Sequence, residues 1–96
     1  MRTFDTKQAD IASSVITTQT LVLDADGYVQ GANVECRWAK VIAEAQKTIY
    51  IGGNSDVAVT CPLLSNTVWQ EFKIANTDAL HFKGTTADKI YIISGS

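Results

Sequence analysis

Residues that bind metals or form disulfide bonds are scarce in this sequence. There is one histidine, His81, and the two cysteines, Cys36 and Cys61, lie 25 positions apart. None of them has a cysteine or histidine neighbour at the spacing of metal ligands, so we expect no metal site and no cofactor. A disulfide is the alternative, but in a reducing cytosol both thiols are expected to be reduced and to act as small buried hydrophobic residues.

The sequence also lacks an excess of positive charge and has no long apolar run. The formal net charge is −2, whereas a surface that binds nucleic acid normally carries a basic stripe. The opening MRTFDTKQADIASS lacks the apolar core of a signal peptide, and no apolar run approaches the length of a membrane span. These absences predict a protein of a soluble compartment, with neither nucleic acid nor a membrane as its partner.

No motif with a known catalytic or ligand-binding mechanism is present. We expect His81, which is flanked by two apolar residues, to be a solvated strand histidine rather than a catalytic base. The stretch from Asp24 to Gly27 resembles the start of a calcium loop, but the later ligands are missing, so a plain Asp-Gly turn is expected. Gly52-Gly53 lacks the remaining residues of a phosphate loop and is expected to be a turn. The sequence therefore predicts no catalytic residue and no enzymatic activity.

The composition is that of one small globular domain. The 96 residues are 46% hydrophobic and 19% charged, which is typical of a folded chain that builds a core without disulfide or metal cross-links. Residues 1–14 are polar and of mixed charge, and we expect them to form an N-terminal arm. Residues 15–96 are expected to form a single domain.

Short runs rich in β-branched and aromatic residues, separated by turn residues, predict an all-β fold. The predicted strands are Val15 to Leu23, Tyr28 to Val34, Thr48 to Ile51, Val57 to Cys61, Thr67 to Ile74, Leu80 to Lys83 and Lys89 to Ile93. The connection before the last run has the length of a hairpin loop. Strands at this spacing are typical of a small antiparallel β-sandwich or a jelly-roll-like barrel.

The segment from Cys36 to Gln46 fits two secondary structures. Its apolar residues fall at helical spacing, but they also alternate along the chain. In a strand its charged residues change face between Arg37 and Lys40, which would require a bulge near Trp38. We assign a strand, and the deciding weight comes from the family pattern given below.

Trp69 is the residue that we single out for binding. Strand alternation over residues 67–74 places Trp69, Glu71 and Lys73 on the polar face. The opposite face carries Val68, Gln70, Phe72 and Ile74. An exposed tryptophan with a charged rim is typical of an anchor in a protein interface, so these three polar-face residues are the interface candidates. The alternative is that a loop or the N-terminal arm of the same chain covers the indole ring.

Six short pieces follow one another in the second half of the chain. They are Ile49-Tyr-Ile-Gly-Gly53, Val57 to Cys61, Pro62-Leu-Leu64, Val68 to Ile74, Leu80-His-Phe82 and Ile90-Tyr-Ile92. In this order they resemble the layout of a group of small phage virion proteins known as head decoration, cement or head fibre proteins. In one departure, Ser65-Asn66-Thr67 stands where that family usually has a Pro-Gly-Glu-like turn, although Asn66 can adopt the left-handed conformation that such a turn needs.

The resemblance implies a structural protein of the bacteriophage virion. Such a protein would be made in the host bacterial cytoplasm and would decorate or cement the capsid surface. Its partners would be the major capsid protein and further copies of itself, with a trimer as the first expectation. A neck or tail component, such as an adaptor or a fibre-attachment protein, is the main alternative. A carbohydrate-binding adhesion module is a further one, and it would require Trp38, Tyr50, Trp69 and Tyr91 to form a clustered aromatic platform.

Overall fold

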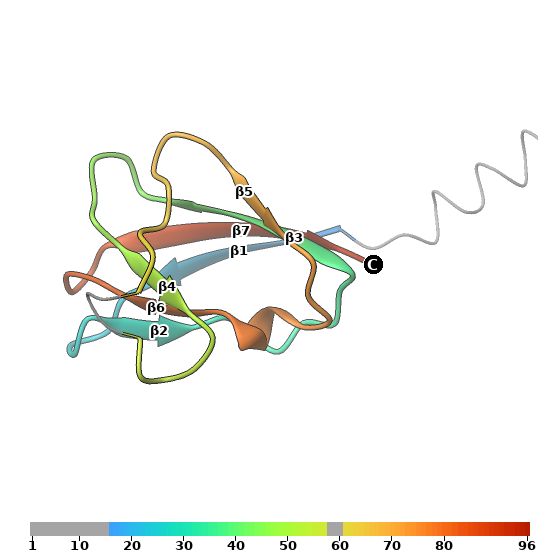
Figure 1. Cartoon of the computed structure of the whole chain (residues 1–96), viewed down its shortest axis with the longest axis horizontal. Helices are drawn as coiled ribbons and strands as arrows, with labels where there is room; N and C mark the ends of the chain where they lie inside the picture. The colour runs from blue at the N-terminus through green and yellow to red at the C-terminus, as the bar shows by residue number, and fades with distance from the viewer. Residues whose placement is uncertain (1–15, 58–60) are drawn as a thin grey trace, which may run out of the picture.

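Two antiparallel β-sheets make up the computed structural model of the chain, which describes residues 16–57 and 61–96 (Figure 1). Its elements are β1 (Ile16–Val22), β2 (Tyr28–Gln30), β3 (Trp38–Ala43), β4 (Tyr50–Gly52), β5 (Gln70–Phe72), the 3-10 turn η1 (Thr77–Ala79), β6 (His81–Lys83) and β7 (Lys89–Gly95). The first sheet has the order β1-β7-β3-β5 and the second the order β2-β6-β4. The predicted all-β antiparallel sandwich is therefore confirmed. The expected N-terminal arm, and most of the strand predicted from Val57 to Cys61, lie outside the described residues.

Successive strands alternate between the two sheets. The odd-numbered strands belong to the first sheet and the even-numbered ones to the second, so each connection passes between the sheets, as most connections of a jelly roll do. The hairpin predicted before the last strand is therefore wrong, because residues 84–88 connect β6 in one sheet to β7 in the other. A connection of this length serves both arrangements, and the choice between them is made by the packing of the sheets.

The central strand β7 pairs with β1 on one side and with β3 on the other without interruption. On β3 the side chains of Ala39, Val41 and Ala43 are buried and alternate with more exposed residues, as in a strand with one face on the core. The strand assigned to this segment is therefore confirmed at its centre. The predicted bulge is wrong: β3 begins at Trp38, so Arg37 precedes the strand and no charged residue has to change face.

The core lies between the sheets and consists mainly of aliphatic side chains. Phe82 of β6 and Ile90 and Ile92 of β7 are each at most 1% exposed. Burying a side chain of this size stabilises the fold by about 1.5–3 kcal/mol. The same cluster contains Leu23, Ala39, Val41, Ala43, Ile49, Ile51, Leu64 and Leu80.

Buried Thr77 joins β1 to the turn that precedes β6. The Thr77 hydroxyl donates to the carbonyl of Ala32 and accepts from the side-chain amide of Gln19 at 3.0 Å. The oxygen of the same Gln19 side chain accepts from the backbone N–H of Ala32, also at 3.0 Å. Since Gln19 is the middle residue of β1, these bonds fix the strand from its inner face.

The turn between β1 and β2 is the Asp-Gly turn that the sequence predicts. A carboxylate oxygen of Asp24 accepts from the N–H groups of Asp26 at 2.9 Å and Tyr28 at 3.0 Å. Gly27 has a φ of +72°, a conformation that favours glycine. A Cβ at Gly27 would lie 2.2 Å from the carbonyl oxygen of Gly84, so the two loops at this end of the sandwich touch through their backbones.

Candidate interaction surface

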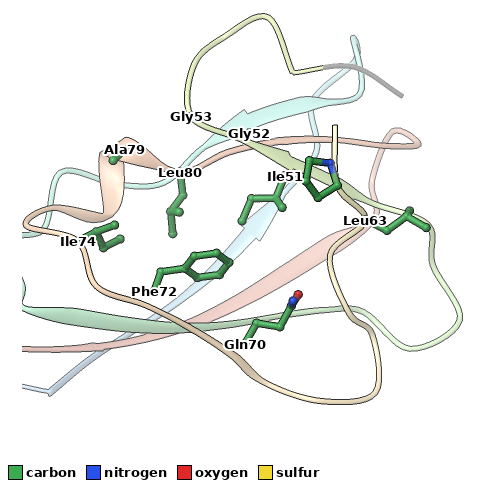
Figure 2. A pocket seen from close by; sticks show the side chains of 10 residues that line it. Ile51, Gly52, Gly53, Leu63, Gln70, Phe72, Ile74, Ala79 and Leu80 are labelled. Carbon is green, nitrogen blue, oxygen red and sulfur yellow. The ribbon is translucent and has the colours of Figure 1, made fainter. Parts of the chain in front are cut away.

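An apolar pocket of about 440 Å³ opens at the edge of the sandwich between β4 and β5. Figure 2 shows Ile51 of β4, Leu80 and Phe72 of β5 pointing toward one another across it. Gln70 supplies the polar side chain of an otherwise apolar lining. The lining residues are Ile51, Gly52, Gly53, Pro62, Leu63, Gln70, Phe72, Ile74, Ala79 and Leu80.

The pocket exists because the two sheets are not sealed at this edge. Among the described residues, the outer edge of β4 is covered by a short bridge between Tyr50 and Leu63. In this bridge the N–H of Ile51 donates to the carbonyl of Pro62 at 3.0 Å and the N–H of Leu64 to the carbonyl of Ile49 at 2.8 Å. The strand then ends at Gly52, and neither Gly52 nor Gly53 places a side chain in the space. The facing edge strand β5 is only three residues long. The apolar side chains behind these edges therefore remain accessible.

Three exposed apolar residues accompany the pocket. The exposed fractions are 59% for Leu63, 63% for Val68 and 42% for Trp69. Leu63 lines the pocket, and Val68 and Trp69 directly precede Gln70, which also lines it. These three residues are referred to below as the β4–β5 rim. Exposed apolar surface of this kind, beside a pocket, is typical of sites that bind protein partners.

Ser65 holds the turn that leads into β5. Its hydroxyl oxygen accepts from the N–H groups of Thr67 at 3.3 Å and Val68 at 3.0 Å. The backbone N–H of Ser65 donates to the side-chain oxygen of Gln70 at 2.8 Å. These bonds fix the direction in which the chain approaches β5 and so position the loop that carries Trp69.

Asn66 does not adopt the left-handed conformation expected of it. Among the described residues other than glycine, a positive φ occurs at Gln46, with 66°, and at Ala87, with 75°. The side-chain amide of Asn66 instead donates to the carbonyl of Lys47 at 2.9 Å. The turn is thus closed by side-chain hydrogen bonds rather than by a left-handed residue.

The strand predicted over residues 67–74 is shorter in the structure, and this changes the setting of Trp69. β5 begins only at Gln70, because the hydroxyl of Ser65 engages the N–H groups of the two residues before Trp69. Val68 is exposed, so its predicted place on the core face is wrong, whereas Phe72 packs against the core as predicted. Trp69 is exposed, but it lies in the loop before β5 rather than on the outer face of a strand.

Glu71 and Lys73, the other two interface candidates, form an ion pair with each other. The Nζ atom of Lys73 lies 2.8 Å from a carboxylate oxygen of Glu71, and both side chains are exposed. The hydrogen bond from Lys73, helped by its charge, lowers the pKa of the Glu71 carboxyl. An exposed pair contributes little to stability, so both charges remain available to a partner. That Trp69, Glu71 and Lys73 form an interface stays a prediction.

His81 is buried, so the expectation of a solvated strand histidine is wrong. It lies on β6 as predicted, but it is only 9% exposed, and its Nδ1 atom is 2.6 Å from the phenolic oxygen of Tyr28. β6 is the middle strand of the second sheet, and Tyr28 lies on the neighbouring strand diagonally opposite His81, within reach of an aromatic side chain. The burial therefore follows from the central position of the strand.

Cys36 and Cys61 are both free, and neither lies in a described strand. Cys36 is buried as expected, and its Sγ atom lies 3.4 Å from the carbonyl oxygen of Ile74. Cys61 is only half-buried, at the bend before Pro62. The expectation of two buried thiols therefore holds for Cys36 and is wrong for Cys61.

The aromatic residues that a carbohydrate-binding platform would need are divided between the sheets. Tyr50 lies in the second sheet, whereas Trp38 and Tyr91 lie in the first. Trp38 covers Gly95, where an added Cβ would lie 2.5 Å from the indole ring. Tyr91 pairs with Ile42, toward the other end of β3. The residues named for this alternative therefore do not share one surface.

Two other kinds of site have no counterpart in the part of the chain that the structure describes. Over residues 16–57 and 61–96, no three His, Cys, Asp or Glu side chains are grouped so that they could hold a metal ion. Over the same ranges, no helix has the length and apolar character needed to cross a bilayer.

Comparison with known proteins assigns no family to the chain. A scan against protein-family models finds no match, and a search of curated proteins finds none. Among solved structures the chain is similar to one from Bacillus endospore appendages, described as a novel family of disulfide-linked pili. The identity is 14% and the TM-score 0.44, over 85% of this chain and 81% of that one. It is also similar to hydroxypropylphosphonic acid epoxidase from S. wedmorenis, with 12% identity and a TM-score of 0.45, over 85% of this chain and 43% of the enzyme. Likenesses at this level carry no conclusion about what the chain binds.

Proposed function

We propose that this chain is a structural protein of a phage virion that decorates or cements the capsid by binding the major capsid protein. The observation that carries the proposal is the apolar pocket between β4 and β5 with the exposed β4–β5 rim beside it. A protein of this kind adds interface area to a shell and needs no catalytic group. Copies of the chain also associate with one another in this proposal, with a trimer as the first expectation.

The pocket brings together the pieces on which the resemblance to phage head decoration proteins rests. Apart from Ala79, every lining residue belongs to one of the pieces 49–53, 62–64, 68–74 and 80–82. These pieces are far apart in the sequence and meet at one edge of the sandwich. This chain resembles the head decoration proteins in the order of these pieces, and the pieces converge on an accessible pocket. Both points support the proposal that the pocket is part of a capsid-binding surface.

The rim has the physical character of an interface anchor. Tryptophan is enriched among the residues that dominate binding energy, and truncating one such anchor typically costs about 2 kcal/mol or more of binding free energy. The Glu71–Lys73 ion pair, close to Trp69 in the sequence, supplies charged groups beside the β4–β5 rim. Many copies on a symmetric lattice reinforce one another, because each bound copy raises the effective concentration of the contacts beside it. Modest single contacts thereby produce a stable coat.

Binding of the purified protein to empty capsids of the phage that encodes it tests the proposal. Co-sedimentation measures the affinity and cryo-EM the location of the bound copies, which we expect to follow the capsid lattice. Trp69→Ala should weaken binding by about 30-fold, which corresponds to a loss of about 2 kcal/mol. The control Thr85→Ala, in the exposed loop between β6 and β7, should bind as the unmodified chain does.

A neck or tail component is the alternative that this experiment distinguishes. The same small sandwich with the same exposed rim would serve in a neck ring or at a fibre attachment. Density confined to a ring at the neck or to the tail would reject decoration and support the alternative. A chain that binds no part of the particle would reject both.

A further inference from the structure

The edges of the two sheets differ in how well they are protected against pairing with another chain. The edge strands β2, β4 and β5 are each three residues long; β4 is bridged at Tyr50 by Leu63, and β5 carries the charged Glu71. β1 is seven residues long and contains no charged residue, proline or glycine. Its ladder with β7 is regular throughout, so no bulge turns the edge away. Charges, prolines, bulges and shortness are the usual protections of an edge strand, and β1 has none of them.

The outer edge of β1 presents hydrogen-bonding groups at alternate residues. Just beyond the strand, the N–H of Leu23 donates to the carbonyl of Asp88 at 2.9 Å, toward β7. Successive residues of a strand direct their backbone groups to opposite edges. The residues whose groups point away from β7 are therefore Ile16, Thr18, Thr20 and Val22. Their side chains are exposed, and no other backbone group within the described residues pairs with them.

The sequence of β1 is nearly symmetric about Gln19. If two copies align antiparallel with their Gln19 residues opposite each other, Thr18 of each copy faces Thr20 of the other, and Ile16 faces Val22. These are the residues with outward backbone groups, so each pair exchanges two hydrogen bonds. Threonine pairs and pairs of β-branched side chains across strands stabilise a sheet. We propose that the β1 edge is a self-association site, at which β1 of a second copy pairs antiparallel about a two-fold axis at Gln19.

The side chain of Gln19 does not obstruct the proposed two-fold axis. Its side chain is directed inward by the bonds to Thr77 and Ala32. A strand already fixed from inside loses little conformational freedom when a partner pairs with its outer edge. The pairing joins the first sheets of two copies into one continuous sheet, with β5-β3-β7-β1 of one copy followed by the same order reversed in the other.

A second copy fits this edge better than an unrelated strand, because the residue matching is symmetric about one position. The contact is small. One pair of strands buries less accessible surface than stable complexes, which typically bury about 1,200–2,000 Å². We therefore expect a dissociation constant between about 1 μM and 1 mM in solution. Where many copies are held close together, the contact is formed more often. The inference does not rest on the proposed role on a capsid. The two-fold contact at β1 closes with two copies, so a trimer on a capsid would use a different contact.

A charge-swap experiment tests the two-fold pairing. Thr18→Lys/Thr20→Lys places like charges opposite each other across the axis, and Thr18→Glu/Thr20→Glu does the same with negative charges. A mixture of the two variants places lysine opposite glutamate. Sedimentation velocity from micromolar to millimolar concentration measures the dimer fraction. We expect dimers of the unmodified chain, monomers of each variant alone, and dimers again in the equimolar mixture.

The matched control is Thr48→Lys/Thr85→Lys, which adds the same charge at two exposed positions outside β1. It should dimerise as the unmodified chain does, and circular dichroism melting checks that every variant is folded. An unmodified chain that stays monomeric at millimolar concentration overturns the inference. The inference is also overturned if the charge variants associate as the unmodified chain does, or if a trimer forms that is insensitive to the charges. Either result would place the contact between copies outside β1. Capsid binding through Trp69 is measured separately and is unaffected by such a failure.

Discussion

At the scale of single residues, burial separates the chemistry of the two cysteines. Burial raises the pKa of the Cys36 thiol, and a weaker opposing effect comes from a hydrogen bond with the backbone of Trp38. Cys61 is half-buried at the bend before Pro62. Because the thiolate is the reactive form of cysteine, the buried Cys36 thiol with its raised pKa is expected to react slowly, whereas Cys61 is more accessible to a reagent.

We expect Cys61 to react with a thiol reagent in the native protein and Cys36 to react only as the chain unfolds. Labelling with and without denaturant, read by mass spectrometry, measures both rates. The pH dependence has a definite sign: the pKa of Cys36 in the folded state lies above the unfolded value of about 8.5, so the unfolded chain loses this proton first. The contribution of the buried Cys36 thiol to the free energy of unfolding is complete when the pH is below the unfolded pKa. It is lost as the pH rises through the pKa of the folded state. Rapid labelling of Cys36 without denaturant, or the mass of an internal disulfide, would contradict this expectation.

At the scale of elements, the positions of the strands were more predictable than their lengths. β1 and β7 lie where the sequence predicts strands, because each is a run of alternating β-branched and apolar residues with a full ladder to a neighbour. β5 is much shorter than predicted. The hydroxyl of Ser65 takes the N–H groups of Thr67 and Val68, and alternation along the sequence does not show this competition between side chain and ladder.

The pairing of strands was less predictable than their positions. β6 and β7 were expected to form a hairpin, but they lie in different sheets, where Phe82 and Ile92 belong to the same core cluster. The burial of His81 also depends on long-range pairing. β6 is the middle strand of its sheet because β2 and β4, which are distant in the sequence, pair with its two edges. Local spacing fixes where strands form, whereas long-range packing decides which strands become neighbours.

β5 and the loop before it give neighbouring aromatic residues opposite roles. Phe72 packs against the core, whereas Trp69 is exposed in the loop. We expect Phe72→Ala to lower the free energy of unfolding by about 2–4 kcal/mol and Trp69→Ala to lower it by less than about 1 kcal/mol. Urea denaturation of both variants measures the difference. A large loss for Trp69→Ala with little loss for Phe72→Ala would place the indole in the core and remove the proposed anchor.

At the scale of the whole molecule, the pocket could not be predicted because its walls come from distant parts of the chain. The exposure of Trp69 was predicted, but from strand parity, and the structure gives a different cause in the Ser65 turn. A signal was nevertheless present in the sequence: Gly52 and Gly53 leave the end of β4 without side chains. That signal predicts an opening only when the facing edge of the other sheet is also short, as β5 is.

Gly53 offers a way to add a side chain at the lining of the pocket without disturbing the fold. Apart from Gly53 and its two chain neighbours, no described residue has an atom within 4 Å of a Cβ built at Gly53, and the φ of Gly53 is not positive. We therefore expect Gly53→Leu to change the free energy of unfolding by no more than about 0.5 kcal/mol. If a side chain of the capsid protein enters the pocket, Gly53→Leu should weaken capsid binding by at least about tenfold, whereas Gly53→Ala, which adds only a methyl group, should bind nearly as the unmodified chain does.

Combining this change with Trp69→Ala shows whether the pocket and the rim contact the same part of the partner. Residues that share a partner segment give non-additive effects, with a coupling of about 0.5–3 kcal/mol, whereas independent contacts add. We expect coupling, because Trp69 directly precedes Gln70 and both Gln70 and Gly53 line the pocket. Capsid affinities of the two single variants and the double variant measure it. A folded Gly53→Leu variant that binds capsids as tightly as the unmodified chain would contradict contact of the partner with the Gly53 side of the pocket.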